Sequence, residues 1–308
     1  MRGRRRRLST PPAVACEMTE VIAVFGPTAS GKSDVAEVLA DRLGTEVVSA
    51  DALQVYRGLS ILTNQSERQT RLVAVRDLTE EMSVAEYARL AHEAIDELVE
   101  AHGSAVVAGG TGLYLRAALV DLHVPPAPEN GARARWESVY DEDPVAAHAR
   151  LAEVDGRAAA VVHPNDRRRV VRALELAEVG ASLVPADDRL WSHELRRPTL
   201  VAGLDVPPAV LEERIRARAE RMFAAGVVEE VRAAVRHGVS PTAEKATGLR
   251  ELAALQPEEA FEQIVVRTRR YAAYQRKWMR RIPGIVMIDA DRPADEVADE
   301  ILEVARAR

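Results

Sequence analysis

The sequence has almost none of the residues that build disulfide-stabilised, zinc-clustered or membrane-embedded proteins. Its 308 residues include a single cysteine, Cys16, so neither an internal disulfide nor a zinc or redox motif of paired cysteines can form. No uninterrupted apolar run reaches the length of about 18 residues that indicates a transmembrane helix. Aromatic residues make up only 4% of the chain, so the core must consist mainly of Ala, Val, Leu and Ile. These absences predict a cytoplasmic protein with no membrane partner.

Lysine is also scarce, and the chain as a whole is not basic. Lysine occurs only at Lys32, Lys245 and Lys277, and every other cation is arginine. A GC-rich genome explains this bias, but the rarity makes each lysine worth examining. The 42 basic and 48 acidic residues give a formal charge of −6, which excludes a uniformly basic nucleic-acid coat protein. Any nucleic-acid surface must therefore be a local patch.

What is present is the composition of a folded globular protein. Hydrophobic residues make up 47% and charged residues 29%, which provides enough apolar mass for a sizeable core. The length predicts two domains, or one large domain with an insertion. We expect a monomer.

The first residues are unlike the rest of the chain. Met1 is followed by a run of arginines without the apolar segment of a secretory signal. Three interpretations are open: an RNA-binding arm, part of an Arg-rich transit peptide, or an extension upstream of a translation start at Met18. We favour the third, and we expect residues 1–18 to form a disordered tail.

Strand and helix patterns alternate after this tail. The apolar run Val21–Phe25 predicts a strand buried on both faces, and a second short strand is expected at 46–50. Helical spacing occurs at 33–43 and 83–101, and a further buried strand is expected at 105–108. The alternation predicts an α/β fold with a parallel, doubly wound sheet.

A proline-rich break at 124–128 ends this alternation. From 132 to about 180 the chain has helical character, with Asp143 and Asp155 marking the breaks between helices. We therefore expect a mainly helical insertion at 122–197.

The α/β pattern resumes after the insertion. The expected elements are strands at 199–206 and 285–289 and helices at 208–236 and 257–281. The two halves together predict a core of residues 19–121 and 198–308.

A glycine-rich loop follows the first strand and opens the first helix. It fits the pattern G-x-x-x-x-G-K-[ST], in which backbone N–H groups and the helix dipole bind phosphate oxygens. The lysine adds a point charge, and the hydroxyl of Ser33 can bind Mg²⁺. The residues of this predicted phosphate or diphosphate site are Gly26, Pro27, Thr28, Ala29, Ser30, Gly31, Lys32 and Ser33.

Two further turns follow predicted strands. Asp51 ends the second strand, where a carboxylate faces the ligand crevice of a parallel sheet. It could act there as Mg²⁺ ligand, general base or ribose anchor, or simply bind loop amides. Thr111 follows Gly109 and Gly110, and it would project a hydroxyl between closely approaching backbones, although a tight turn explains this motif equally well.

These blocks, in this order, resemble the tRNA dimethylallyltransferase (isopentenyltransferase) family. The resemblance covers nearly all of residues 21–290. It rests on V-F-G-P-T-A-S-G-K-S, D-A-L-Q-V-Y-R-G, V-A-G-G-T-G-L-Y-L-R-A, H-P-N-D-R-R-R-V-V-R-A-L-E from residue 163, R-I-x-x-R-x-x-x-M-x-x-x-G from residue 214, K-A-T-G-L-R from residue 245, and T-R-R-Y-A-A-Y-Q-R-K-W from residue 268.

The resemblance implies a P-loop NTPase-like core and a prenyl transfer. The donor would be dimethylallyl diphosphate rather than ATP, although the loop is built like a nucleotide site, with Mg²⁺ as cofactor. The acceptor would be N6 of the adenosine 3′-adjacent to the tRNA anticodon, flipped out of its stack because N6 is otherwise inaccessible.

Residue roles follow from the same resemblance. Asp51 would take the N6 proton, and Thr111 would hydrogen-bond the amine. Arg218 would join Lys32 in neutralising the departing diphosphate. The implied tRNA contacts are Asp51, Ala52, Leu53, Gln54, Thr111, Arg133, Arg168, Arg169, Arg172, Lys245 and Arg250.

The segment 264–281 supports an RNA surface from composition alone. It carries seven cations and no acids, with aromatic residues between them, which suits phosphates and unpaired bases. The alternative is a solvated helix whose aromatics face the core, and for Tyr271 and Trp278 we favour core packing.

The chain departs from the family pattern at several positions. The serine after the catalytic aspartate is Ala52, D-I-G-T is S-I-L-T at 60–63, P-H-H-L-I-D is replaced at 70–77, and K-R of the late helix is Ala273-Tyr274. Three other functions therefore stay open: an adenylate isopentenyltransferase, a small-molecule P-loop kinase, and an RNA-binding paralogue without activity.

Overall fold

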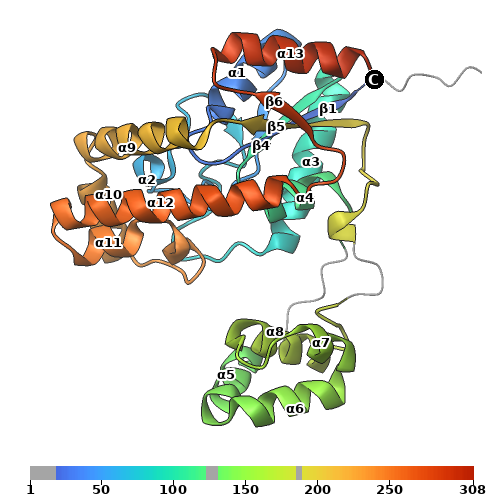
Figure 1. The fold of residues 1–308 in the computed structure, drawn as a ribbon, viewed down its shortest axis with the longest axis vertical. Coiled ribbons are helices and arrows are strands. Elements are labelled where there is room, and N and C mark those ends of the chain that lie inside the picture. The colour runs from blue at the N-terminus through green and yellow to red at the C-terminus, as the bar shows by residue number, and fades with distance from the viewer. Residues whose placement is uncertain (1–18, 123–130, 185–188) are drawn as a thin grey trace, which may run out of the picture.

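The computed structural model describes residues 19–122, 131–184 and 189–308. The predicted tail, with Cys16 and both candidate start codons, lies outside the described residues, as does the proline-rich break. The core is a six-stranded sheet in which every pair of neighbouring strands is parallel (Figure 1). The strands run in the order β3 (Thr70–Arg71), β2 (Val47–Ser49), β4 (Ala105–Gly109), β1 (Val21–Phe25), β5 (Thr199–Asp205) and β6 (Val286–Asp289). The predicted parallel α/β fold is confirmed.

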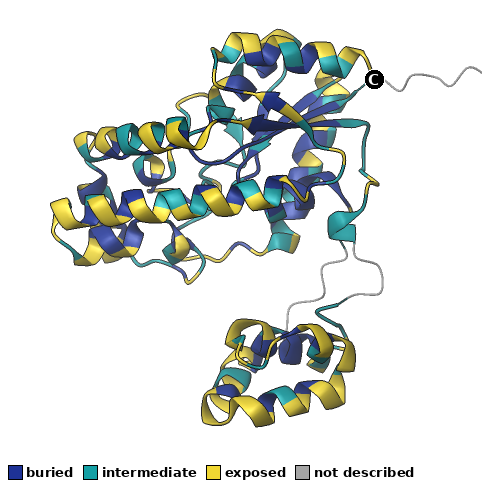
Figure 2. Cartoon of the chain, viewed as in Figure 1, coloured by how far each residue is buried: buried dark blue, intermediate teal, exposed yellow. Residues whose placement is uncertain are grey.

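Helices cover both faces of this sheet. α1 (Lys32–Leu43) and α13 (Ala294–Arg306) lie side by side on one face, and α3 (Val84–His102) and α4 (Gly112–Leu119) pack on the other (Figure 1). The side chains of β1 alternate accordingly: Ile22 and Val24 join the core beneath α1 and α13, whereas Ala23 joins the other. Figure 2 shows the strands buried and the outer helix faces exposed.

The remaining helices of the core, apart from the short α2, belong to the second half of the chain. The single helix expected at 208–236 is wrong: α9 (Pro208–Ala224) ends before Gly226, and α10 (Val227–His237) begins after it. Gly226 has a φ of +90°, a conformation that side-chain-bearing residues rarely adopt, so the chain turns there. A short α2 (Ser60–Thr63), α11 (Leu249–Ala254) and the long α12 (Pro257–Met279) complete this part.

Four helices between the two halves of the core share a hydrophobic cluster of their own. They are α5 (Ala132–Glu142), α6 (Pro144–Val154), α7 (Gly156–Val161) and α8 (Arg167–Glu178), with a core that includes Leu151 and Leu174. Asp143 and Asp155 cap α6 and α7 by accepting hydrogen bonds from backbone N–H groups, which explains the breaks. In Figure 1 this bundle lies apart from the sheet.

The chain returns from the bundle to the sheet past a buried arginine. Arg116 of α4 is fully buried; its Nε donates to the carbonyl of Leu190 (2.7 Å) and its Nη2 to that of Ser192 (2.7 Å). The guanidinium thus holds the returning segment against α4. Within the described residues, no helix combines the length and apolarity that crossing a bilayer needs.

We expect Arg116→Met to lower the free energy of unfolding by about 1–3 kcal/mol, because the partly buried carbonyl groups of Leu190 and Ser192 lose their donor. Denaturant titration followed by circular dichroism measures this loss. Arg89→Met is the control, since Arg89 forms an exposed pair with Glu93 that is worth less than about 1 kcal/mol. Equal stability losses in the two variants would contradict the assigned role.

Candidate active site

The glycine-rich loop at 26–33 joins β1 to α1 and presents unpaired backbone donors. Ala29 and Gly31 have positive φ angles of 64° and 84°, which turn the chain sharply before α1. Among the described residues, the N–H groups of Gly31, Lys32 and Ser33 have no hydrogen-bond acceptor. Free amides at a helix N-terminus form a site for an anion.

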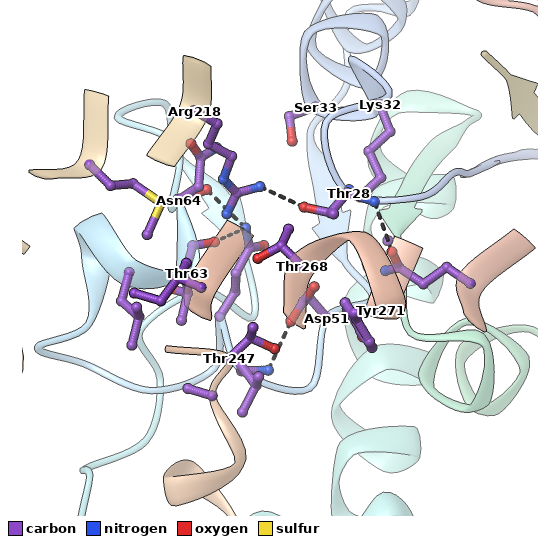
Figure 3. A pocket seen from close by; sticks show the side chains of 18 of the residues that line it. Thr28, Lys32, Ser33, Asp51, Thr63, Asn64, Arg218, Thr247, Thr268 and Tyr271 are labelled. Carbon is purple, nitrogen blue, oxygen red and sulfur yellow. Dashed lines mark hydrogen bonds between the residues drawn. The ribbon is translucent and has the colours of Figure 1, made fainter. Parts of the chain in front are cut away.

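Two cations lie in the pocket beside this loop, one from the loop itself and one from α9. Lys32 projects from the start of α1, and Arg218 reaches over from α9, where its Nη1 donates to Oγ1 of Thr28 (2.9 Å) (Figure 3). Burial lowers the pKa of Lys32 from 10.5 to about 8, although the nearby Asp51 carboxylate opposes the shift. Burial likewise lowers the pKa of Arg218. Both charges are therefore poorly solvated and would gain from a bound anion.

Asp51 lies in the same pocket, just after β2. Its Oδ1 accepts a hydrogen bond from the N–H of Leu53 (2.9 Å), so one carboxylate oxygen binds the loop, and Oδ2 has no hydrogen-bond donor among the described residues. Thr111 lies beside it: its Oγ1 is 3.5 Å from the N–H of Ala52 and 3.5 Å from the hydroxyl of Tyr271. The structure thus places the predicted hydroxyl beside the residue that follows the predicted carboxylate. Asp51 and Tyr271 line the pocket, and Thr111 contacts Tyr271 without being one of the lining residues.

Glycine at position 109 permits the close approach of the two loops that carry these groups. A Cβ on Gly109 would lie 2.1 Å from the carbonyl oxygen of Ala50. No side chain fits there, because real Cβ atoms essentially never come within 3.0 Å of another atom. The second glycine turn is therefore more than a tight turn, since it holds Thr111 next to Asp51.

The far wall of the pocket is apolar. Leu62 of α2, Met222 of α9 and Ile264 of α12 line it, and all three are buried. Gly248 supports this wall from behind, since a Cβ there would lie 3.1 Å from Ile264 and 3.3 Å from Leu62. The pocket therefore combines an anion site with a surface suited to a small hydrocarbon group.

The side chain of Gln54 is occupied within the protein. Its Nε2 donates to the carbonyls of Thr63 (3.2 Å) and Asn64 (3.0 Å), and its Oε1 accepts from Oγ of Ser49 (2.8 Å). The residue lines the pocket but has no free donor in this structure. Its neighbour Leu53 also lines the pocket, and Ala52 is partly buried beside it.

The other implied tRNA contacts lie elsewhere. Lys245 and Arg250 are exposed near Ala246, which lines the pocket. Four of the six arginines on α5 and α8 of the helical bundle are implied tRNA contacts, and none of these four lines the pocket. Two of these, Arg133 and Arg172, approach Glu175 (3.9 and 3.1 Å). The other two, Arg168 and Arg169, are exposed and form no ion pair with any described residue.

The basic segment 264–281 forms most of α12. In the folded protein, acidic residues from other elements neutralise part of the positive charge that the segment carries. Glu251, Glu212 and Asp205 from other elements pair with three of its arginines, and a fourth arginine lies over the ring of Trp191. The expectation for Trp278 is confirmed, because it packs against the core and the ring of Trp191. For Tyr271 it is wrong: the hydroxyl points into the pocket toward Thr111, and burial raises the pKa of this tyrosine to about 12.

Several pocket residues were not predicted as site residues. They include the polar residues Thr247, Thr268, Tyr271 and Gln275 as well as the apolar wall. Gln275 offered a signal in the sequence, because it occupies a core-facing position of α12 in register with Ala272 and Met279. A polar residue on an otherwise apolar helix face needs a buried partner.

The side chains near the loop fit a magnesium ion that is coordinated mainly by water molecules and by the phosphate oxygens of a bound molecule. Among the described residues, no three His, Cys, Asp or Glu side chains gather around a possible metal position. Ser33 lines the pocket at the start of α1, and Asp51 supplies the carboxylate nearby. In sites of this kind the protein supplies only a hydroxyl and one or two carboxylates, and Mg²⁺ keeps water molecules and phosphate oxygens as its other ligands.

Comparison with known sequences finds the same family along most of the chain. A family model described as IPP transferase matches residues 54–282. The tRNA dimethylallyltransferase of Streptomyces coelicolor is 42% identical over 291 residues, covering 90% of this chain and 91% of the relative. The enzyme of the same name from Thermobifida fusca is 41% identical over 295 residues, with 90% and 92% covered.

Solved structures with similar folds come from proteins of the same kind. A tRNA isopentenylpyrophosphate transferase from Bacillus halodurans aligns with a TM-score of 0.66 at 30% identity, covering 94% of this chain and 95% of that one. A eukaryotic dimethylallyltransferase acting on tRNA aligns with a TM-score of 0.74 at 25% identity, covering 88% and 74%.

Proposed function

Because the chain belongs to the IPP transferase family, we propose that it transfers a dimethylallyl group from dimethylallyl diphosphate to tRNA. The acceptor is N6 of the adenosine 3′-adjacent to the anticodon, and diphosphate is released. The observation that carries this proposal is a single pocket with an anion loop, two cations, an apolar wall and one carboxylate.

In the proposed complex, each part of the donor binds to its own surface of the pocket. The diphosphate lies on the free N–H groups of the loop, between Lys32 and Arg218. The dimethylallyl group packs against the wall of Leu62, Met222 and Ile264. This arrangement leaves the reacting carbon between the phosphate site and Asp51.

The transfer then needs one proton acceptor and stabilisation of one leaving group. N6 forms a bond to C1 of the dimethylallyl group while the bond between C1 and the diphosphate oxygen breaks, and the electron pair leaves with the diphosphate. Asp51 takes the proton from N6 through the oxygen that Leu53 does not hold. Thr111 holds the amine, and Arg218 neutralises the charge that develops on the diphosphate.

We propose that Mg²⁺ binds beside the loop through Ser33. There it would screen the diphosphate charge and make diphosphate a better leaving group. The donor set described above supports this assignment.

The tRNA surface is assigned to two regions. Ala52, Leu53, Lys245 and Arg250 are near the pocket and would receive the flipped adenosine and its neighbours. The arginines of α5 and α8 would bind the backbone of the same tRNA at a distance. We propose further that the enzyme acts in the cytoplasm, and that it acts as a monomer because the anion loop, both cations and the carboxylate of the pocket already lie together within one chain.

Incubation with labelled dimethylallyl diphosphate and either bulk tRNA or free AMP tests the choice of acceptor. We expect label in acid-precipitable tRNA, no labelled AMP, and no requirement for ATP. Labelled AMP with unlabelled tRNA would instead support an adenylate isopentenyltransferase, and obligatory ATP hydrolysis a kinase.

The lowered pKa of Lys32 predicts how diphosphate binding depends on pH. In the free protein the lysine loses its proton as the pH rises through about 8, whereas bound diphosphate favours the charged form. Above pH 8, binding must therefore take up a proton, and log Kd for pyrophosphate rises by at most about one per pH unit. Calorimetry between pH 7 and pH 9.5 measures this dependence.

The Lys32→Arg variant is the control for that titration. Its guanidinium stays charged over the whole range, so it lacks the proton uptake. Pyrophosphate itself titrates equally in both experiments. Parallel pH curves for the two proteins would show that the lysine does not titrate as expected.

A further inference from the structure

The side-chain amide of Gln275, on α12, is buried between the diphosphate loop and the loop that carries Thr111. Gln275 is 2% exposed. Its Oε1 accepts a hydrogen bond from the N–H of Thr28 (2.8 Å), and its Nε2 donates to the carbonyl of Gly110 (2.9 Å). Thr28 belongs to the diphosphate loop, and Gly110 directly precedes Thr111, so one side chain ties both loops together.

The surrounding structure is built around this amide. A Cβ on Gly110 would lie 2.3 Å from Nε2 of Gln275 and 3.0 Å from the carbonyl oxygen of Gly26, so glycine is needed where the loops meet. Thr28 is held a second time through its hydroxyl, which accepts from Arg218. Its N–H group is therefore not available to an anion and serves as an anchor.

We propose that Gln275 is a positioning residue that fixes the distance between the diphosphate loop and the Thr111 loop. The inference rests on the proposed function, in which the leaving group occupies the first loop and the attacking amine the second. A bond-forming step depends steeply on this separation, and a displacement of about 1 Å can cost on the order of 10²-fold in rate. Binding of each substrate depends on one loop alone and is far less sensitive.

Gln275→Met tests the proposal, because methionine has a similar length but cannot bridge the loops. We expect kcat for prenyl transfer to fall on the order of 10²-fold, while the KM values and the Kd of pyrophosphate change by less than about threefold. Gln263→Met is the matched control, since Gln263 is exposed on the same helix, and it should keep the wild-type kcat.

Two further variants keep the test decisive if Gln275→Met does not fold. Gln275→Glu keeps an acceptor for Thr28 but, as a carboxylate, has no donor for Gly110. Gly110→Ala displaces the amide from the other side. Each should lower kcat with binding retained.

Three outcomes would overturn the proposal. One is a kcat within about threefold of wild type in folded variants. Another is loss of kcat and pyrophosphate binding together, which would indicate a merely structural role. A wild-type protein and a Gln263→Met variant that both lack transferase activity would refute the proposed function itself, and the inference with it.

Discussion

Replacing Asp51 by asparagine should lower kcat for prenyl transfer by about 10²–10⁴-fold and leave the Kd of tRNA nearly unchanged. The adenine N6 is a poor nucleophile because its lone pair is delocalised into the ring, so its proton must leave as the new bond forms. Asparagine keeps the size of the side chain, and its amide oxygen can still accept the hydrogen bond from Leu53. The variant therefore removes the general base but keeps the hydrogen bond that holds the loop at Leu53. Single-turnover kinetics and a tRNA binding assay measure the two quantities separately.

Two other variants separate the base from the anion site. Lys32→Ala should mainly weaken pyrophosphate binding. Asp34→Asn makes the same chemical change at an exposed position in the first turn of α1 and should retain kcat within a few fold. Near-full kcat in Asp51→Asn, or loss of tRNA binding instead, would make Asp51 a structural or Mg²⁺-binding residue.

The second large effect is expected at Arg218. Its guanidinium is partly buried, fixed by Thr28 and placed opposite the diphosphate loop, so it meets the negative charge that develops as the carbon–oxygen bond breaks. Arg218→Gln keeps a donor for Thr28 but removes the charge. We expect kcat to fall by about 10²–10³-fold, the usual cost of removing one preorganised donor, with a weaker Kd for pyrophosphate.

Arg216→Gln is the matched control on the same helix. Arg216 forms an ion pair with Glu262 away from the pocket, and such pairs contribute little. Rapid-quench measurement of the transfer step compares the variants. A kcat for Arg218→Gln within a few fold of the control would assign Arg218 to anchoring Thr28 rather than to the reaction.

Patterns confined to neighbouring residues predicted most of the α/β core. The apolar run of β1 and the glycine loop after it need no distant partner to be recognised, and Asp51 is placed by its position at a strand end. α13 also has a clear amphipathic pattern, in which Val297 and Ile301 face the core, although this helix was not among the predicted elements.

Other elements lack a local signal. α4 is buried on nearly all sides, so it shows no polar face, and the sequence did not predict it. β3 consists of only two residues, Thr70 and Arg71, which pair with β2. A strand of this length is too short to show a recognisable alternation of apolar and polar residues.

The site itself depends on contacts between distant parts of the chain. Tyr271 and Thr111 are 160 residues apart, and the bond from Gln275 to Thr28 spans 247 residues. Acids from three other elements neutralise arginines of α12, so charge counted along one segment overstated its basic character. Pattern and composition therefore indicated which residues have reactive groups, but the fold decides which of them meet.

The most direct test of the account is to locate the product within the tRNA. Purified protein, dimethylallyl diphosphate and a tRNA transcript with adenosine 3′-adjacent to the anticodon are combined without ATP, and the digested RNA is analysed by mass spectrometry. The matched transcript has guanosine at that position. We predict one N6-dimethylallyl group at that adenosine, one diphosphate released for each transfer, and no reaction with the guanosine transcript. Prenylation of free AMP with unmodified tRNA, or a phosphorylated product formed only with ATP, would contradict the account.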